Sequence, residues 1–299
     1  KYSELNDLPK PNWWPKNAHV SFLYKYNQNF TNLDINIWIH GIEGQSWKWY
    51  NFDKYLKPFW FFKHFIYNSL HILYFKRFLR DNNHKIKLIF VSKWMKNVFV
   101  KDLNIKKNLP KNIVIPNPID NIFFKKIKRQ KKIKKNILIV KNFSSYKYAG
   151  DITIDYLKKL SFNPIFKEFN FTIIGKGVIL DRNIQKIENF KNIKIIKKFL
   201  DNKNIFKYHK NNSIFIYLTR MDSQSVTLSE AISSGLVCIS SKNTAIPEFI
   251  KNNYNGLLIN NYGEFLHSLV LLNNNFKLLQ KLSKNSIKIS KKNLKSEII

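Results

Sequence analysis

Acidic residues are scarce in this sequence, with 19 Asp and Glu against 52 Lys and Arg, and the formal net charge is +33. Such an excess is typical of proteins that bind nucleic acid, because clustered basic side chains neutralise phosphates. Here 47 of the 52 basic residues are lysines, scattered among Asn and Ile. The pattern therefore disfavours a nucleic-acid partner and favours a solvated basic surface that could meet an anionic membrane surface.

Cysteine is almost missing, since Cys238 is the single one. A disulfide within the chain is excluded, which fits a reducing compartment and a cytoplasmic location. The pair Asp-x-Asp, a common carboxylate arrangement for a divalent metal, does not occur, so we predict no metal site and no cofactor. No signal peptide is predicted. The chain begins at Lys1 without methionine, and we expect that a leading segment is missing.

Long uninterrupted apolar runs are also lacking. The nearest approach is residues 58–75, PFWFFKHFIYNSLHILYF, which Lys63, His64 and His71 interrupt. These charges and imidazoles disfavour a helix that spans a membrane. Two alternatives stay open, a helix packed on a domain core and a helix lying on a bilayer surface through aromatic residues beside basic ones.

What the sequence does contain is 299 residues with 44% hydrophobic and 15% aromatic side chains, enough for two globular domains. Residues 213–250 show its organisation best. An apolar run at 214–218 is followed by a polar segment, a helical pattern from Val226 that stops at Gly235, and a second apolar run at 236–239. This order predicts strand, helix and parallel strand, with the polar residues at the carboxyl end of the first strand, where ligands bind in open parallel sheets.

Two acids frame that polar segment, Asp222 and Glu230. The amides at the start of the following helix, near Ser225, Val226 and Thr227, suit a phosphate, and a carboxylate one turn later could accept two sugar hydroxyls. An alternative stays open, because Thr227 and Glu230 also have the Thr-x-x-Glu spacing of a capping box.

Asp-x7-Glu followed by AISSGLVCISS and AIPEFI resembles the Glu-x7-Glu signature of family 4 glycosyltransferases. The resemblance implies that Glu230 binds the ribose of a sugar nucleotide and that Asp222 lies against the donor sugar. It extends in order through WIHG, FVSKWM, IPNPID and GKG, which are also similar to segments of that family. It departs from the family at Asp222, at Ser225 and at Lys141, where Glu, Gly and Arg are usual.

The same resemblance assigns further residues. His40, after a predicted strand at 35–39, would face the reacting sugar. Lys141 and Lys147, after a predicted strand at 136–140, would hold the donor diphosphate as it leaves. Gly175 belongs to the GKG segment, and the nucleotide base would lie near Phe199 and Leu200.

The fold that the resemblance implies is α/β of the GT-B class, two Rossmann-like doubly wound domains facing across a cleft, the first incomplete. Alternating strand and helix patterns agree with it. We predict an acceptor-side domain at 1–124, a basic linker at 125–135 (KKIKRQKKIKK) and a donor-binding domain with closing helices at 136–299.

The implied function is a retaining, metal-independent hexosyltransferase that moves a sugar from a nucleotide-sugar donor to a glycan or lipid-linked acceptor. The implied setting is surface polysaccharide or lipopolysaccharide biosynthesis on the cytoplasmic side, with peripheral attachment to the membrane. Two alternatives stay open. One is a non-catalytic or truncated GT-B module that binds a membrane or partner, and the other is a sugar-nucleotide epimerase of the same fold.

Overall fold

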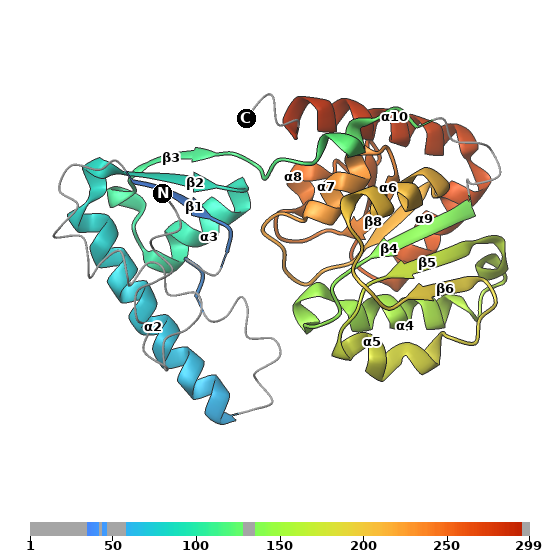
Figure 1. The fold of residues 1–299 in the computed structure, drawn as a ribbon, viewed down its shortest axis with the longest axis horizontal. Coiled ribbons are helices and arrows are strands. Elements are labelled where there is room, and N and C mark those ends of the chain that lie inside the picture. The colour runs from blue at the N-terminus through green and yellow to red at the C-terminus, as the bar shows by residue number, and fades with distance from the viewer. Residues whose placement is uncertain (1–34, 42–43, 47–57, 128–134, 295–299) are drawn as a thin grey trace.

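The structure is a computed structural model that describes residues 35–41, 44–46, 58–127 and 135–294. Figure 1 shows these residues as two packed units joined by an extended segment after β3. Most of the predicted linker and the beginning of the predicted first domain lie outside the described residues.

The first unit holds a three-stranded parallel sheet in the order β1-β2-β3. Its elements are β1 (Ile35–Ile39), α2 (Pro58–Asp81), β2 (Ile86–Phe90), α3 (Lys93–Leu103) and β3 (Lys111–Val114), with short 3-10 turns η4 (Asn83–Lys85) and η5 (Lys106–Asn108). Phe75, Phe78 and Leu79 of α2 are buried in the core over this sheet. The last turns of α2 are therefore a helix packed on a core. Among the described helices, none combines the length and apolar content needed to cross a membrane.

The second unit holds a six-stranded parallel sheet in the order β6-β5-β4-β7-β8-β9. Its strands are β4 (Asn136–Val140), β5 (Asn170–Ile174), β6 (Ile193–Ile196), β7 (Ile214–Tyr217), β8 (Val237–Ser241) and β9 (Gly256–Ile259). The covering helices are α4 (Gly150–Leu160), α5 (Val178–Asn183), α6 (Asn202–Asn211), α7 (Val226–Ser233), α8 (Ile246–Phe249), α9 (Tyr262–Asn274) and α10 (Phe276–Asn293). Short 3-10 turns are η6 (Asn121–Phe124), η8 (Tyr146–Tyr148), η9 (Pro164–Glu168) and η10 (Ile184–Lys186).

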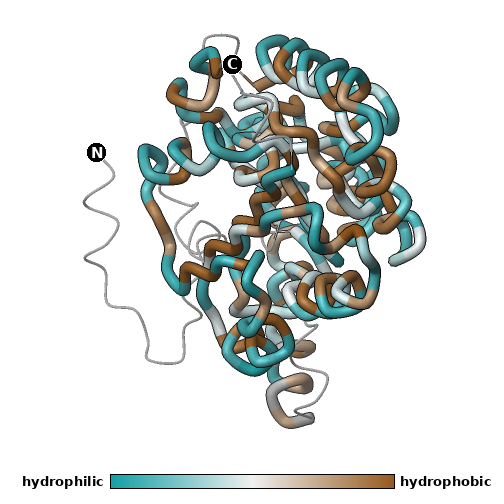
Figure 2. Tube along the Cα trace, turned by 90° about the vertical axis from the view of Figure 1, so that its right-hand side faces the viewer, coloured by the Kyte–Doolittle hydropathy of each residue, from teal (hydrophilic) through white to brown (hydrophobic). Residues whose placement is uncertain are grey.

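Strand composition explains why this sheet is buried on both faces. Ile137, Leu138 and Ile139 of β4 are fully buried, with successive side chains on opposite faces. Two hydrophobic clusters accordingly cover the two sides of the sheet. Figure 2 shows hydrophobic colour along the strands and alternating colour along the covering helices, as expected for helices with one apolar face.

The closing helices predicted for the second domain are α9 and α10. Asn275 ends α9 and caps α10 by accepting a hydrogen bond from the Leu278 amide at 2.9 Å. A similar cap lies at Ser92, the start of α3, where the side chain accepts a hydrogen bond from the Met95 amide at 3.1 Å.

The chain crosses between the two units near 115–118. Ile119 and Phe123 already belong to the core of the second unit, where η6 packs on α6 and α7. The domain boundary at 125–135 stays a prediction, since residues 128–134 lie outside the described part of the chain. Because Ile119 and Phe123 pack in the core of the second unit, the chain joins that unit before residue 125.

Side chains of the second unit hold the first. The Glu248 carboxylate accepts hydrogen bonds from the backbone amides of Lys93 and Trp94 at 2.8 and 2.6 Å, at the start of α3. Helix N-termini stabilise such a negative charge. The Gln224 side chain accepts from the Asn117 amide at 2.5 Å and donates to its carbonyl at 3.2 Å. The Gln224 contacts fix the crossing segment to the loop after β7, and the Glu248 contacts fix α3 to α8.

Gly175 marks the tightest approach of two loops. It has φ of +150°, and a Cβ there would lie 1.9 Å from the Lys141 carbonyl oxygen. We predict that Gly175→Ala lowers the free energy of unfolding by about 3 kcal/mol or more, because backbone must move to relieve the clash.

Urea denaturation of both proteins measures this change. Gly263→Ala is the matched control, because Gly263 is exposed and a Cβ there meets only the Asn261 side chain, at 3.3 Å. We expect its stability to stay within about 0.5 kcal/mol of the parent. Equal stabilities for the two variants would contradict the packing around Gly175.

Candidate functional site

The order of the second sheet places a site between β4 and β7. The chain proceeds from β4 outward to β5 and β6, and from β7 outward in the other direction to β8 and β9. The loops after β4 and β7 therefore diverge to opposite faces and leave a crevice at their carboxyl ends. Ligands of doubly wound sheets bind at such a switch point.

A cavity of about 290 Å³ lies at this point. The residues that line it come from the ends of β4 and β7, from the segment after β6 and from the start of α7. They are Val140, Lys141, Asn142, Tyr148, Phe199, Tyr217, Asp222, Gln224, Ser225, Val226 and Thr227.

Six predicted site residues thus line one cavity, namely Lys141, Phe199, Asp222, Ser225, Val226 and Thr227. Five others are not among the lining residues. Glu230 is one turn further along α7, Lys147 lies in η8 beside Tyr148, and Gly175 packs against the Lys141 carbonyl behind the cavity. Leu200 is half-buried against the core, and His40 is on the first unit.

Ser225 starts α7. Its hydroxyl oxygen accepts a hydrogen bond from the Leu228 amide at 3.1 Å, which makes Ser225 the N-cap. The alternative in which Thr227 and Glu230 form a capping box is therefore wrong, because Thr227 lies inside the helix. The backbone amides of Val226 and Thr227 donate hydrogen bonds to no acceptor among the described residues. These two N–H groups and the helix dipole suit an anion at the cavity wall.

Asp222 faces the same cavity. Its carboxylate accepts a hydrogen bond from the Tyr217 hydroxyl and another from the Gln224 amide at 3.1 Å. Burial raises the pKa of Asp222, while the Tyr217 hydrogen bond and the charge of Lys147 act in the opposite direction. The Tyr217 hydroxyl therefore orients the Asp222 carboxylate, which lines the cavity and can accept hydrogen bonds there.

Lys141 does not present its charge freely to the cavity. Its ammonium donates to the carbonyls of Tyr148, at 2.6 Å, and Leu218, and lies 4.8 Å from the centre of the Tyr217 ring. Burial lowers the pKa of Lys141 to about 7. The first cation of the predicted pair is thus engaged by backbone carbonyls, and its protonation is poised near neutral pH.

Lys147 is held in place by its neighbours. The Arg220 amide donates to the Lys147 carbonyl at 3.0 Å, and the Arg220 guanidinium forms two hydrogen bonds of 2.7 Å with the Asp151 carboxylate. The Lys147 ammonium lies 5.4 Å from the centre of the Tyr148 ring, and Tyr148 lines the cavity. Since α4 begins at Gly150, this ion pair fixes η8 against the end of β7.

Glu230 is buried, with 7% of its surface exposed, and no described residue donates a hydrogen bond to its carboxylate. Burial, together with the charge of Asp120, raises the pKa of Glu230 to about 7. A carboxylate with so little exposed surface and no protein donor is costly, because it has lost most of its hydration. Hydroxyl groups of a ligand would supply the missing donors.

The first unit approaches the site through His40. The Ser223 hydroxyl donates to the His40 carbonyl oxygen, so the loop after β1 touches the residue next to Asp222. The exposed His40 ring stacks on Trp38, with ring centres 6.0 Å apart. The backbone of His40 therefore lies beside the loop that carries Asp222.

Tyr148, Tyr217 and Gln224 line the cavity and were missed from the sequence. Tyr217 is the next-to-last residue of the apolar run at 214–218 and the last residue of β7, and this position at the strand terminus was the signal available. Tyr148 and Gln224 lie in loops whose course no periodic pattern predicts.

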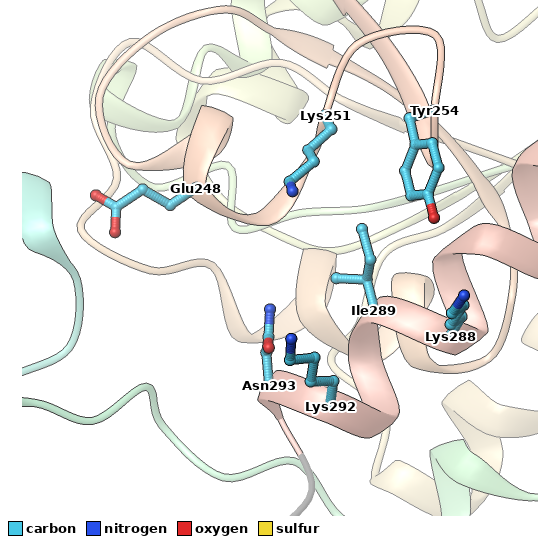
Figure 3. Close-up of a pocket in the computed structure, with 7 residues that line it drawn as sticks. All are labelled: Glu248, Lys251, Tyr254, Lys288, Ile289, Lys292 and Asn293. Atoms are coloured by element: carbon cyan, nitrogen blue, oxygen red, sulfur yellow. The ribbon is translucent and has the colours of Figure 1, made fainter.

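A larger cavity, of about 470 Å³, lies elsewhere on the second unit. Figure 3 shows Lys251 and Lys292 pointing into it from opposite sides, while Glu248 points away. Its lining comes from α8, α10 and the turn before β9, away from the carboxyl ends of β4 and β7. Its volume alone does not make it the better candidate.

The raised pKa of Glu230 gives a pH prediction. Between the ordinary value of 4.5 and about 7, the folded protein binds more protons at this site than the unfolded chain does. Stability is thus lost as pH rises through that window. We expect Glu230→Gln to exceed the parent in free energy of unfolding by roughly 2 kcal/mol at pH 8, and to match it near pH 4.5.

Urea denaturation at the two pH values tests this expectation, and the difference between variant and parent cancels the pH dependence of other groups. A difference that does not change with pH would show that the Glu230 carboxyl is not desolvated in the folded protein.

Solved structures with the same arrangement are glycosyltransferases and a sucrose-phosphate synthase. The glycosyltransferase from Rickettsia africae ESF-5 is 17% identical, with a TM-score of 0.61 over 75% of this chain and 63% of that one. Sucrose-phosphate synthase from Thermosynechococcus elongatus is 9% identical, with a TM-score of 0.70 over 92% and 67%. A S. aureus TarM mutant in complex with Fondaparinux, alpha-GlcNAc-glycerol and UDP is 16% identical, with a TM-score of 0.61 over 74% and 44%.

These identities establish the fold alone, and the predicted GT-B class is confirmed. The chain spans only 63% and 44% of the lengths of the Rickettsia and S. aureus proteins. No curated protein matches it. The family model described as "Glycosyl transferases group 1" matches residues 119–289, more than half of the chain and all of the sheet around the candidate site. The chain therefore belongs to the group 1 glycosyl transferases.

Proposed function

We propose that the cavity between β4 and β7 binds a nucleotide-sugar donor, and that the chain is the donor-binding part of a retaining hexosyltransferase. The observation that carries this proposal is the buried carboxylate of Glu230, which has no hydrogen-bond donor among the described residues and lies one turn along α7 from the amides of Val226 and Thr227 at the cavity wall. A nucleoside diphosphate offers both missing partners, hydroxyls for the carboxylate and phosphates for the amides.

The donor then occupies the site in a definite direction. The diphosphate lies at the amides of Val226 and Thr227, with Lys147 as the nearby cation. The ribose hydroxyls reach Glu230, and the base lies toward Phe199, which is 55% exposed at the cavity edge. The Asp222 carboxylate, oriented by Tyr217, accepts a hydrogen bond from a hydroxyl group of the sugar.

In the proposed transfer the bond between the anomeric carbon and the diphosphate oxygen breaks, and the leaving diphosphate keeps the electron pair. The acceptor hydroxyl attacks from the same face and gives its proton to the leaving oxygen. Preorganised amides and cations stabilise the charge that develops on the diphosphate. Lys147 and the start of α7 supply that stabilisation here, and we propose that no metal is needed.

Protonated Lys141 adds positive charge behind the diphosphate. With its pKa near 7, an incoming diphosphate favours the charged form, so donor binding draws a proton onto this lysine. His40, placed beside Ser223, is proposed to face the reacting sugar.

The acceptor belongs to the first unit, and we propose a glycan or a lipid-linked glycan in surface polysaccharide or lipopolysaccharide biosynthesis at the cytoplasmic face of a membrane. UDP in the S. aureus TarM mutant structure and in the pneumococcal GtfA complex supports a nucleotide of this class.

Calorimetric titration with UDP, GDP and ADP, each with and without magnesium, tests the proposal. We expect saturable binding of one nucleotide that does not need the metal. Glu230→Gln should weaken that binding about tenfold or more, because an amide replaces the acceptor of two hydroxyl hydrogen bonds.

Glu188→Gln is the matched control, since Glu188 is an exposed acid of the same unit, and its affinity should equal that of the parent. A folded protein that binds none of the three nucleotides would overturn the proposal and favour a non-catalytic GT-B module.

A further inference from the structure

Helix α2 is apolar on two opposite sides. One side carries Phe75, Phe78 and Leu79, which are buried over the first sheet. The other side faces solvent. Figure 1 shows that the amino-terminal turns of α2 run away from the sheet, so this second side continues where the helix leaves the body of the first unit. A helix in a globular protein ordinarily needs only one apolar face.

The exposed side is a continuous stripe. Phe59, Phe62, Ile66, Leu70 and Leu73 follow one another at intervals of three and four residues, which aligns them along one line of an α-helix. Their exposed fractions are 76, 63, 54, 44 and 62%. At 1.5 Å per residue the stripe is about 21 Å long. Single exposed hydrophobic residues need no explanation, but a linear set of five large ones does.

Basic residues border this stripe. Lys63 lies on one side of it, Lys76 on the other, and Arg77 and Arg80 continue its line beyond Leu73. The helix has one acidic residue, Asp81, which forms ion pairs with Arg77 and Arg80 at 3.7 and 3.1 Å. The stripe therefore combines large apolar side chains with a positive border.

A second copy of the chain fits this surface poorly. A two-fold interface would bring the same basic border against itself, and both copies carry a net charge of +33. A bilayer with anionic headgroups offers the opposite charge at its surface and an apolar interior a few ångströms below it.

We propose that the stripe Phe59, Phe62, Ile66, Leu70 and Leu73 docks on an anionic lipid bilayer, with α2 parallel to the membrane plane. The apolar side chains enter the boundary between headgroups and acyl chains, and Lys63, Lys76, Arg77 and Arg80 contact the headgroups. Attachment is peripheral and reversible. This inference does not depend on nucleotide binding, because α2 contributes nothing to the cavity in the second unit.

A fluorescent label on the stripe tests the proposal in the full chain. Cys238, the single cysteine, is fully buried, and burial raises the pKa of its thiol, so an introduced cysteine is labelled selectively. An environment-sensitive fluorophore on Leu70→Cys should shift to shorter wavelength on vesicles of phosphatidylcholine with one quarter phosphatidylglycerol. The same fluorophore on Phe162→Cys, 79% exposed on the second unit, should keep its aqueous spectrum.

Vesicle sedimentation at high salt separates apolar docking from general attraction of a basic protein, because salt screens surface charge. The triple substitution Phe62→Ser, Ile66→Ser, Leu73→Ser should lower the bound fraction about tenfold or more. The control Phe162→Ser should bind as the parent does. Circular dichroism establishes that all variants are folded.

Three results would overturn the proposal. The first is an unshifted label at position 70 in the presence of vesicles. The second is an equal shift at position 162, which would mean unspecific adsorption. The third is a label at position 70 that is already in an apolar environment without vesicles. If that third signal depends on protein concentration, a second copy covers the stripe, and if it does not, the chain itself covers it.

Discussion

Parallel pairing of β4 with β7 is the constraint on which the candidate site depends. Ile137 and Leu138 pair with Ile214 and Phe215, although more than seventy residues separate them in the sequence. That pairing places the ends of two strands side by side and sends their following segments to opposite faces of the sheet. The helix start at Ser225 and the loop at Lys141 share one cavity for this reason. A weaker pairing here would separate the amides at the start of α7 from the basic residues of the loop after β4.

Three buried ionisable groups then differ in how their charge is compensated. Lys141 is satisfied by two carbonyl oxygens, and Asp222 by a hydroxyl and an amide. The Glu230 carboxylate is buried and receives no hydrogen bond from the described residues, which is the least stable arrangement of the three. Such a group lowers the stability of the empty protein and is compensated only when a ligand supplies donors. Under the proposed function, the hydroxyl groups of the nucleotide supply these donors.

Much of the second unit was predictable from the sequence, because its strands are short apolar runs buried on both faces. The predicted strand at 136–140 coincides with β4, and the apolar run at 214–218 contains β7. Polar residues following such runs, like Asp222 and Lys141, could be placed at the same sheet edge. The contacts of Lys141 with two carbonyls could not, since they depend on loop conformations that no local pattern encodes. For the same reason, the sequence left a capping box of Thr227 and Glu230 open, because a hydroxyl residue at either position suits a helix start, and only the structure identifies Ser225 as the N-cap.

Hydrogen exchange measured by mass spectrometry, with and without a saturating nucleoside diphosphate, tests the location of the site most directly. We predict slower exchange in peptides that span 141–148 and 217–230, and unchanged exchange in peptides that span 251–254 and 288–293, which line the larger cavity. Slower exchange confined to the second pair of peptides would contradict the assignment of the cavity between β4 and β7 as the donor site.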